Sequence, residues 1–459
     1  MNTGDKITLD IASINSEGEG IARRDEGKDG VKFVVFVPGA LIGERVVCRV
    51  ERASKNYAAA SMLEIVESSP ARVEPGCPSY GRCGGCQLQH ASYGAQTEMK
   101  REILLDAMRR IGKFTDIDAP PCVPSPDEWG YRNKTTLPVG RHTGYYERRS
   151  HRIVPFEKCP VLKPSLEKLM SDIISAHLRS GLKGYDERKG SGDIRAIAAR
   201  CGECDGAERT LSGVVASRDL GHREFGVLRD IHQKLMSSDR SLVGSALNVK
   251  TSRDNFIWGP LFKQLCGGRF ITARLGDYGF KLDISSFFQI NAPQAERIFD
   301  RARDIIRSFG AKRVLELYSG TGSLTAYIAG VCESVDAVEE WRPAIKLMGE
   351  NMERNGAGNV RVFPESAEGF MSGGNIKPGC YDAIILDPPR TGALEAVIDG
   401  IALAAPKQIL YISCNPATLA RDAARLAEGG KYGVTALEAY DMFPQTSHVE
   451  SVCVMERRT

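Results

Sequence analysis

Asp387-Pro388-Pro389-Arg390 and Ser413-Cys414-Asn415-Pro416 each follow a short apolar run, and together they decide the fold of this chain. The runs, Tyr381 to Leu386 and Gln408 to Ile412, have the length and composition of buried parallel strands. Ligands of an open α/β sheet gather beyond the carboxyl ends of its strands, so both tetrapeptides should lie on one rim. We interpret Cys414 as a nucleophile, and the alternative is a small buried apolar residue at a strand end.

A glycine loop precedes these strands. Val314 to Tyr318 is typical of a buried strand, and the loop Ser319-Gly320-Thr321-Gly322-Ser323 separates it from a helix. The loop lacks the third glycine of a dinucleotide fingerprint and the lysine of a phosphate-binding loop, so it fits a nucleoside without a polyphosphate. The next strand, Ser334 to Val338, ends in Glu339, where an acid accepts ribose hydroxyls. This alternation of strands and helices is the pattern of S-adenosylmethionine-dependent methyltransferases.

Two further polar stretches flank these strands. Glu450 begins the last expected strand, Ser451 to Met455, and should point toward the same rim as Cys414. A thiol and a carboxylate on one rim suit a nucleophile and a base. Upstream, Phe287-Phe288-Gln289-Ile290-Asn291 places amide side chains at an expected domain junction, where such groups are as often structural as ligand-binding.

A cysteine cluster indicates a metal site in the middle of the chain. Three cysteines lie within ten residues, and Gly84-Gly85 lets the backbone fold tightly between two of them. The step Cys159-Pro160 is the best candidate for a fourth thiol. Zinc and an iron–sulfur cluster both accept four thiolates, and spacing alone leaves both open. A second pair, Cys201 and Cys204, is expected in a loop without metal. The expected ligands are Cys77, Cys83, Cys86 and Cys159.

The N-terminal residues predict a small barrel. Lys6 to Ile14, Val31 to Val37 and Arg45 to Val50 have strand length and are separated by glycine-rich turns, which suggests a five-stranded barrel of the OB type. Such barrels often bind nucleic acid, although a purely structural barrel is the alternative. Further on, Tyr131-Arg132-Asn133-Lys134 fits either a phosphate contact or an ordinary strand end. The barrel residues suited to RNA are Arg49, Arg52, Lys55 and Tyr57.

The composition is that of an ordinary soluble globular protein of 459 residues, with 42% hydrophobic and 26% charged residues. Met1 to Asp10 lacks the apolar core of a signal peptide and no apolar run could span a bilayer, so we expect a cytoplasmic protein without a membrane partner. We also expect a monomer. Thirteen cysteines then argue for thiols, metal or catalysis rather than disulfides. The net charge of +3 does not by itself require a polyanion partner.

We therefore expect a multidomain protein with β and α/β parts. Residues 1–68 should form the OB-like barrel, and residues 69–280 a central α+β domain that holds the metal site. Residues 281–459 should form a Rossmann-like methyltransferase domain that binds S-adenosylmethionine.

Taken together, these motifs resemble the RNA uridine-5 methyltransferases, and most closely the branch that acts on 23S ribosomal RNA. The resemblance covers nearly the whole chain, and the barrel is similar to a TRAM domain, which implies RNA binding. Its marks are the four cysteines, Phe288-Gln289-Ile290-Asn291, Tyr318-Ser319-Gly320-Thr321-Gly322, the two tetrapeptides at Asp387 and Ser413, and His448-Val449-Glu450.

The resemblance implies a specific set of cofactors and roles. It implies a four-iron–four-sulfur cluster, bound S-adenosylmethionine and a covalent protein–RNA adduct. The barrel and the cluster together favour ribosomal RNA, since the bacterial branch that acts on transfer RNA typically lacks both; transfer RNA is the alternative. The implied cluster ligands are Cys77, Cys83, Cys86 and Cys159, the implied cofactor contacts are Gln289, Tyr318, Glu339 and Asp387, and the implied nucleophile and base are Cys414 and Glu450.

The chemistry explains why these residues are needed. Carbon 5 of uracil is a poor nucleophile, and a thiolate that adds to carbon 6 makes carbon 5 reactive toward a methyl sulfonium. The pKa of Cys414 should therefore be lowered, or its proton removed as the substrate approaches. Glu450 must then take the carbon 5 proton. The target base has to leave its stack. The cluster has no redox step in this scheme, and we hypothesise that it pins the RNA-binding domain.

Three other activities compete with this assignment. A cytosine-5 methyltransferase commonly uses a cysteine where this chain has Asp387-Pro388-Pro389-Arg390. An adenine-amino methyltransferase would have an aromatic residue in place of Arg390 and would not need Cys414. A non-catalytic iron–sulfur RNA-binding factor would not need Cys414 and Glu450 intact.

Overall fold

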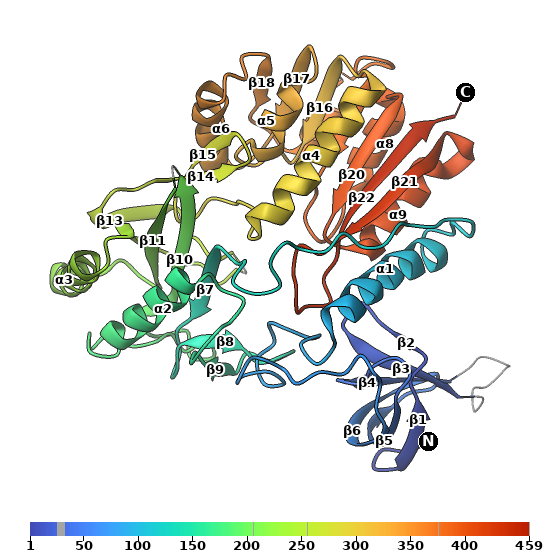
Figure 1. Cartoon of the computed structure of the whole chain (residues 1–459). Coiled ribbons are helices and arrows are strands. Elements are labelled where there is room, and N and C mark those ends of the chain that lie inside the picture. Colours follow the sequence, from blue (N-terminus) through green and yellow to red (C-terminus); the bar gives the residue numbers. More distant parts are fainter. Residues whose placement is uncertain (25–32, 205, 255, 375, 459) are drawn as a thin grey trace.

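The computed structural model describes residues 1–24, 33–204, 206–254, 256–374 and 376–458. Within these residues the chain forms sheets of six, five and seven strands, arranged from the N-terminal to the C-terminal part (Figure 1). Two pairs of short strands, β8 (Gly144–Tyr146) with β9 (Ile153–Pro155) and β14 (Ile271–Leu275) with β15 (Tyr278–Leu282), form separate hairpin-like sheets. None of the described helices is long and apolar enough to cross a membrane.

The N-terminal sheet is the small all-β unit that the sequence predicts. Its strand order is β1-β5-β6-β4-β3-β2, and bulges in the pairing of β5 with β6 bend it. Val35 and Val37 alternate inward from β4 and are fully buried. The sheet has six strands rather than five because Ser13 and Ile14 pair separately with β3. Val31 and Lys32 lie outside the described residues. The strands are β1 (Lys6–Asp10), β2 (Ser13–Ile14), β3 (Glu19–Arg24), β4 (Phe33–Pro38), β5 (Arg45–Ala53) and β6 (Tyr57–Glu67).

The central sheet has the order β13-β12-β11-β10-β7, and the helices α2 and α3 pack on it. The expected loop at Cys201 to Cys204 is wrong, because these residues end the strand β10. The side chain of Cys201 is buried in the core beneath α2, which explains its apolar environment. The elements are β7 (Lys134–Pro138), α2 (Pro164–His177), β10 (Ile194–Cys204), β11 (Ala207–Ala216), α3 (His222–Ser238), β12 (Leu242–Val249) and β13 (Leu261–Gly267).

The C-terminal sheet has the order β18-β17-β16-β19-β20-β22-β21. All neighbouring pairs are parallel except those that involve β22, and the strand order reverses at β16, which creates a switch point at its carboxyl end. The elements are α4 (Ala292–Phe309), β16 (Arg313–Leu317), α5 (Ser323–Ala329), β17 (Ser334–Val338), α6 (Arg342–Arg354), β18 (Val360–Phe363), α7 (Ala367–Ser372), β19 (Ala383–Leu386), α8 (Glu395–Ala404), β20 (Gln408–Ser413), α9 (Pro416–Ala427), a 3-10 turn (Glu428–Gly430), β21 (Tyr432–Tyr440) and β22 (Glu450–Arg457).

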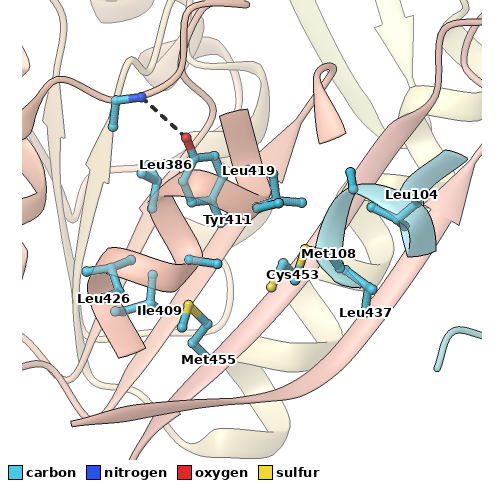
Figure 2. Close-up of a cluster of buried hydrophobic side chains, with 14 of the residues drawn as sticks. Leu104, Met108, Leu386, Ile409, Tyr411, Leu419, Leu426, Leu437, Cys453 and Met455 are labelled. Atoms are coloured by element: carbon cyan, nitrogen blue, oxygen red, sulfur yellow. Dashed lines mark hydrogen bonds between the residues drawn. The ribbon is translucent and has the colours of Figure 1, made fainter. Parts of the chain in front are cut away.

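A helix from the expected central segment completes the core of this last sheet. The helix α1 (Tyr93–Arg110) lies beside α9 and β21 (Figure 1). Its side chains Leu104 and Met108 point toward Leu437 and Cys453 (Figure 2). Lys100, on the same helix, forms a buried ion pair with Asp441 just beyond β21. The N-terminal half of the chain is therefore anchored on the C-terminal sheet.

The packing of α1 makes a prediction about stability. Leu104 is fully buried, so Leu104→Ala should lower the free energy of unfolding by roughly 2–5 kcal/mol. The matched substitution Leu178→Ala, at a side chain that is 78% exposed, should change it by less than about 0.5 kcal/mol. Chemical denaturation followed by circular dichroism measures both. Equal losses for the two variants would contradict this packing.

Candidate active site

Three strand ends place their following residues side by side at the switch point. Leu317 of β16 pairs with Val338 of β17 on one side and with Leu386 of β19 on the other. Because these strands are parallel, the next residue of each leaves the sheet on the same rim. These three residues are Tyr318, Glu339 and Asp387.

The glycine loop is held against Glu339. The Gly320 N–H donates to Glu339 Oε2 at 2.8 Å, and the Trp341 N–H donates to Glu339 Oε1 at 2.7 Å. A carboxylate has about four acceptor positions, so capacity remains for ligand hydroxyls. Tyr318 has φ +64°, a left-handed conformation that is costly for a residue with a side chain. Its hydroxyl donates to Glu368 Oε1 at 3.3 Å, which fixes the direction of the ring.

The segment that contains Gln289 borders this loop. Thr321 Oγ1 donates to the Phe287 carbonyl at 3.4 Å, and Asn133 Nδ2 donates to the Gln289 carbonyl at 2.9 Å. Lys134 is half-buried and its ammonium donates to the Ser286 carbonyl at 3.0 Å. Burial lowers the pKa of Lys134 well below its usual range. The structure thus favours the strand-end interpretation of residues 131–134, whose polar groups position residues 286–290.

A second pair of strand ends brings the thiol and the last carboxylate together. Ser413 of β20 pairs with Ser451 of β22 in an antiparallel register. Cys414, one residue beyond Ser413, therefore lies next to Glu450, one residue before Ser451. Asn415 Nδ2 donates to the Arg390 carbonyl at 2.8 Å, so the two tetrapeptides are joined directly. The structure places the sequence-predicted thiol and acid on the same rim.

The acids on this rim are poorly solvated. Burial raises the pKa of Asp387, and burial together with the nearby Asp387 raises the pKa of Glu450 well above its usual range. Sequence analysis missed a third acid, Glu316, although a charged residue inside the apolar run of β16 was a visible signal. Burial raises the pKa of Glu316 to about 8, and Asp387 adds to the shift. Among the described residues, Glu316 Oε2 has no hydrogen-bond partner.

The environment of Cys414 differs from one expectation. Burial raises the pKa of its thiol to about 12, Glu450 and Asp387 add to this shift, and Arg390 opposes it. The expectation of a lowered pKa is therefore wrong for the protein without substrate. The other expectation, removal of the proton as substrate approaches, remains. Arg390 is exposed, and no role was assigned to it from sequence.

The four expected metal ligands line one cavity of about 180 Å³. The Gly84 N–H donates to the Tyr146 carbonyl at 2.9 Å, and an added Cβ would lie only 3.1 Å from Arg148 Cα, so a side chain here would force the neighbouring backbone to shift. No group of three or more histidine, cysteine, aspartate or glutamate side chains in the described part of the chain is arranged to hold a single metal ion. The cysteines are Cys77, Cys83, Cys86 and Cys159, and Thr446 lies beside them on the cavity wall.

Two family models match parts of the chain. The model described as tRNA (Uracil-5-)-methyltransferase matches residues 274–458, and the TRAM domain model matches residues 2–63. The chain is also similar to a crystal structure of the Pyrococcus abyssi tRNA (uracil-54, C5)-methyltransferase in complex with S-adenosyl-L-homocysteine. That similarity has a TM-score of 0.75 and 26% identity, and it covers 98% of this chain and 100% of that one.

Curated relatives match nearly the whole length of this chain. An uncharacterized RNA methyltransferase of Halalkalibacterium halodurans is 35% identical over 461 residues, which cover 99% of this chain and 98% of that protein. Another, from Gloeobacter violaceus, is 35% identical over 463 residues, which cover 99% of this chain and 97% of that protein. The expected TRAM domain and C-terminal methyltransferase fold are confirmed. The chain belongs to the family of S-adenosylmethionine-dependent RNA (uracil-5-)-methyltransferases.

Proposed function

We propose that the protein methylates carbon 5 of a uridine in 23S ribosomal RNA, with Cys414 as nucleophile and Glu450 as base. The pairing of Ser413 with Ser451 is the observation that carries this proposal. It places a thiol and a carboxyl group next to each other at the end of the sheet, beside the rim suited to the cofactor. A base-flipping enzyme needs such a pair within reach of adjacent ring carbons.

The residues act in a fixed order. Cys414 Sγ forms a bond to carbon 6 of the uracil ring, after its proton passes to solvent through the exposed part of the side chain. Bound S-adenosylmethionine would supply the methyl group from its sulfonium to carbon 5 and would leave as the neutral thioether. When carbon 5 carries the methyl group, Glu450 accepts the proton of that carbon. The bond between Cys414 and carbon 6 then breaks, which restores the ring double bond and the free thiolate.

The rim fits a cationic cofactor. Glu316 is buried and Asp387 is half-buried, both have raised pKas, and Glu316 Oε2 is without a partner among the described residues. A positive charge bound nearby would favour their ionised forms and that of Glu450. The residues proposed to hold S-adenosylmethionine are Gln289, Tyr318, Glu339 and Asp387.

The cysteine cavity fits an iron–sulfur cluster better than a zinc ion. Four thiolates on one zinc ion, with bonds of about 2.3 Å, would have to converge to within roughly 4 Å of each other. The described residues contain no such compact group, yet four thiols surround one cavity. A four-iron–four-sulfur cluster is wider and takes four cysteine ligands. We assign it to Cys77, Cys83, Cys86 and Cys159, with a structural role.

Transfer RNA is the second candidate substrate. The barrel does not separate the two classes, because the Pyrococcus abyssi enzyme, named for a tRNA uridine, aligns with 98% of this chain. Ribosomal RNA is proposed on the resemblance of the motifs to the ribosomal branch. An experiment that offers both RNAs is therefore needed.

The reaction can be stopped at its covalent stage. A fluorine at carbon 5 cannot leave as a proton, so transcripts that contain 5-fluorouridine should trap the protein in the presence of S-adenosylmethionine. We expect mass spectrometry to find the RNA on the peptide that contains Cys414, with 23S ribosomal RNA as the trapped species. Cys414→Ala should bind RNA but form no adduct.

The outcomes of this trap are distinct. An adduct only with transfer RNA would replace the ribosomal substrate. An adduct on a peptide without Cys414 would overturn the assigned nucleophile. The absence of an adduct with either RNA would favour the non-catalytic binding factor.

The reactivity of Cys414 should depend on pH and on its two neighbours. With its pKa raised to about 12, the thiol is protonated at neutral pH, so alkylation by iodoacetamide should still accelerate as pH rises above about 9. Arg390→Gln removes an opposing cation and should slow alkylation at a given pH, whereas Glu450→Gln removes a repelling charge and should speed it. Peptide mass spectrometry isolates the Cys414 signal. If the rate of Cys414 alkylation changed in the same direction in both variants, this electrostatic account would be contradicted.

The cluster assignment predicts metal content. Protein reconstituted with iron and sulfide without oxygen should bind both, and Cys83→Ser should lower its iron and sulfide content and its visible absorbance. Cys201→Ser alters a buried cysteine outside the cavity and serves as the control. Stoichiometric zinc without iron, or equal iron in both variants, would reject the cluster.

A further inference from the structure

One glutamine side chain spans the gap between the cysteine loop and the loop that leads into Glu450. Gln87 Nε2 donates to the Gly84 carbonyl at 2.9 Å, between two of the cavity cysteines. Its other amide atom, Oε1, accepts from the Ser447 N–H at 3.3 Å. Ser447 belongs to residues 441–449, the connection between β21 and β22, which we name the base loop. Gln87 therefore contacts both loops with the two ends of one rigid amide.

The backbone strengthens this connection. The N–H groups of Gln87 and Leu88 both donate to the Gln445 carbonyl, at 3.1 and 3.0 Å. Gln445 has φ +73°, a conformation that a non-glycine residue adopts only when its surroundings hold it. Gln96 supplies that hold, because its Nε2 donates to Gln445 Oε1 at 3.0 Å and its Oε1 accepts from the Gln445 N–H at 2.9 Å. The centre of the base loop is thus clamped by the segment that follows the cysteines.

The base loop also borders the cysteine cavity and leads into the rim that carries Glu450. Thr446 lies on the wall of the cysteine cavity. Two residues later, the pKa of His448 is lowered to about 4. Burial is the main cause, and the nearby cation of Arg390 contributes to the shift. Three residues after Ser447, the chain enters β22 with Glu450. The distance along the chain between the two sites is therefore a few residues of one loop.

We propose that Gln87 is a positioning residue that couples the four-cysteine site to the base loop, so that a filled cysteine site orders the approach to Glu450. The proposal rests on the proposed function in one respect, the role of Glu450 as base. It gives the cysteine site a specific task in the reaction cycle without any redox step. The step that should depend on the coupling is removal of the carbon 5 proton and release of RNA.

A merely structural Gln87 would predict a general loss of stability. A positioning Gln87 predicts a local loss of order in residues 441–449 and a delay at one chemical step. Gln87→Met keeps the length of the side chain and removes both hydrogen bonds. Ser447→Ala is a matched control in the same loop, because it removes the bond of 2.8 Å from Ser447 Oγ to the Ser16 carbonyl of the barrel and keeps the N–H that Gln87 contacts.

Hydrogen–deuterium exchange measures the coupling between the cysteine site and the base loop in the absence of RNA. Full-length protein reconstituted with iron and sulfide is compared before and after removal of iron by a chelator. In the wild type and in Ser447→Ala, iron removal should speed exchange of residues 441–449. In Gln87→Met, at equal iron content, exchange of these residues should already be fast and should change little. Unchanged exchange in the wild type, or a Gln87→Met response equal to that of the wild type, would overturn the proposal.

Kinetics with ordinary uridine RNA supply the second readout. Gln87→Met should lower kcat by roughly tenfold or more at nearly unchanged KM, and a covalent protein–RNA adduct should accumulate, because a misplaced base slows release. Wild-type kcat in this variant would overturn the proposal, as would a loss of activity without adduct. Exchange data remain interpretable if the 5-fluorouridine trap fails, so failure of the coupling and failure of the proposed function are distinguishable.

Discussion

The antiparallel pairing of Ser413 with Ser451 is the constraint on which the active site depends. A shift of one residue would turn every side chain of β22 to the opposite face and would separate Cys414 from Glu450. The register is fixed because both faces of β22 are buried, on one side by α9 and on the other by the core that includes α4. The proposed catalytic pair is therefore positioned by the packing of the sheet core.

The same rim concentrates poorly solvated acids. Glu316, Asp387 and Glu450 lie where burial disfavours ionisation, and Arg390 is the neighbouring cation that opposes it at Glu450. Such an arrangement costs stability in the free protein and suits a site that binds a cationic cofactor and handles protons. The raised pKa of Cys414 follows from the same cause. A thiol with such a pKa is protonated at neutral pH in the free protein.

Local patterns in the sequence predicted the strands, the glycine loop and the rim, because strand ends of a parallel sheet meet at one edge whatever lies elsewhere. Long-range contacts were not predictable in this way. The clamp between Gln96 and Gln445 joins residues 349 positions apart, and α1 packs on a sheet that begins far downstream. The sequence around Lys134 suited a phosphate contact, yet its ammonium donates to the Ser286 carbonyl. A polar pattern alone does not reveal whether its partner is a ligand or a carbonyl.

Loss of the carbon 5 hydrogen is the most direct test of the central claim. RNA with tritium at carbon 5 of uridine is incubated with the protein and S-adenosylmethionine, and the tritium in water is compared with the methyl groups in RNA. The account predicts equal amounts, because each methylation requires Glu450 to remove that hydrogen. Methyl transfer with full retention of tritium would place the modification at another atom and would contradict the roles of Cys414 and Glu450.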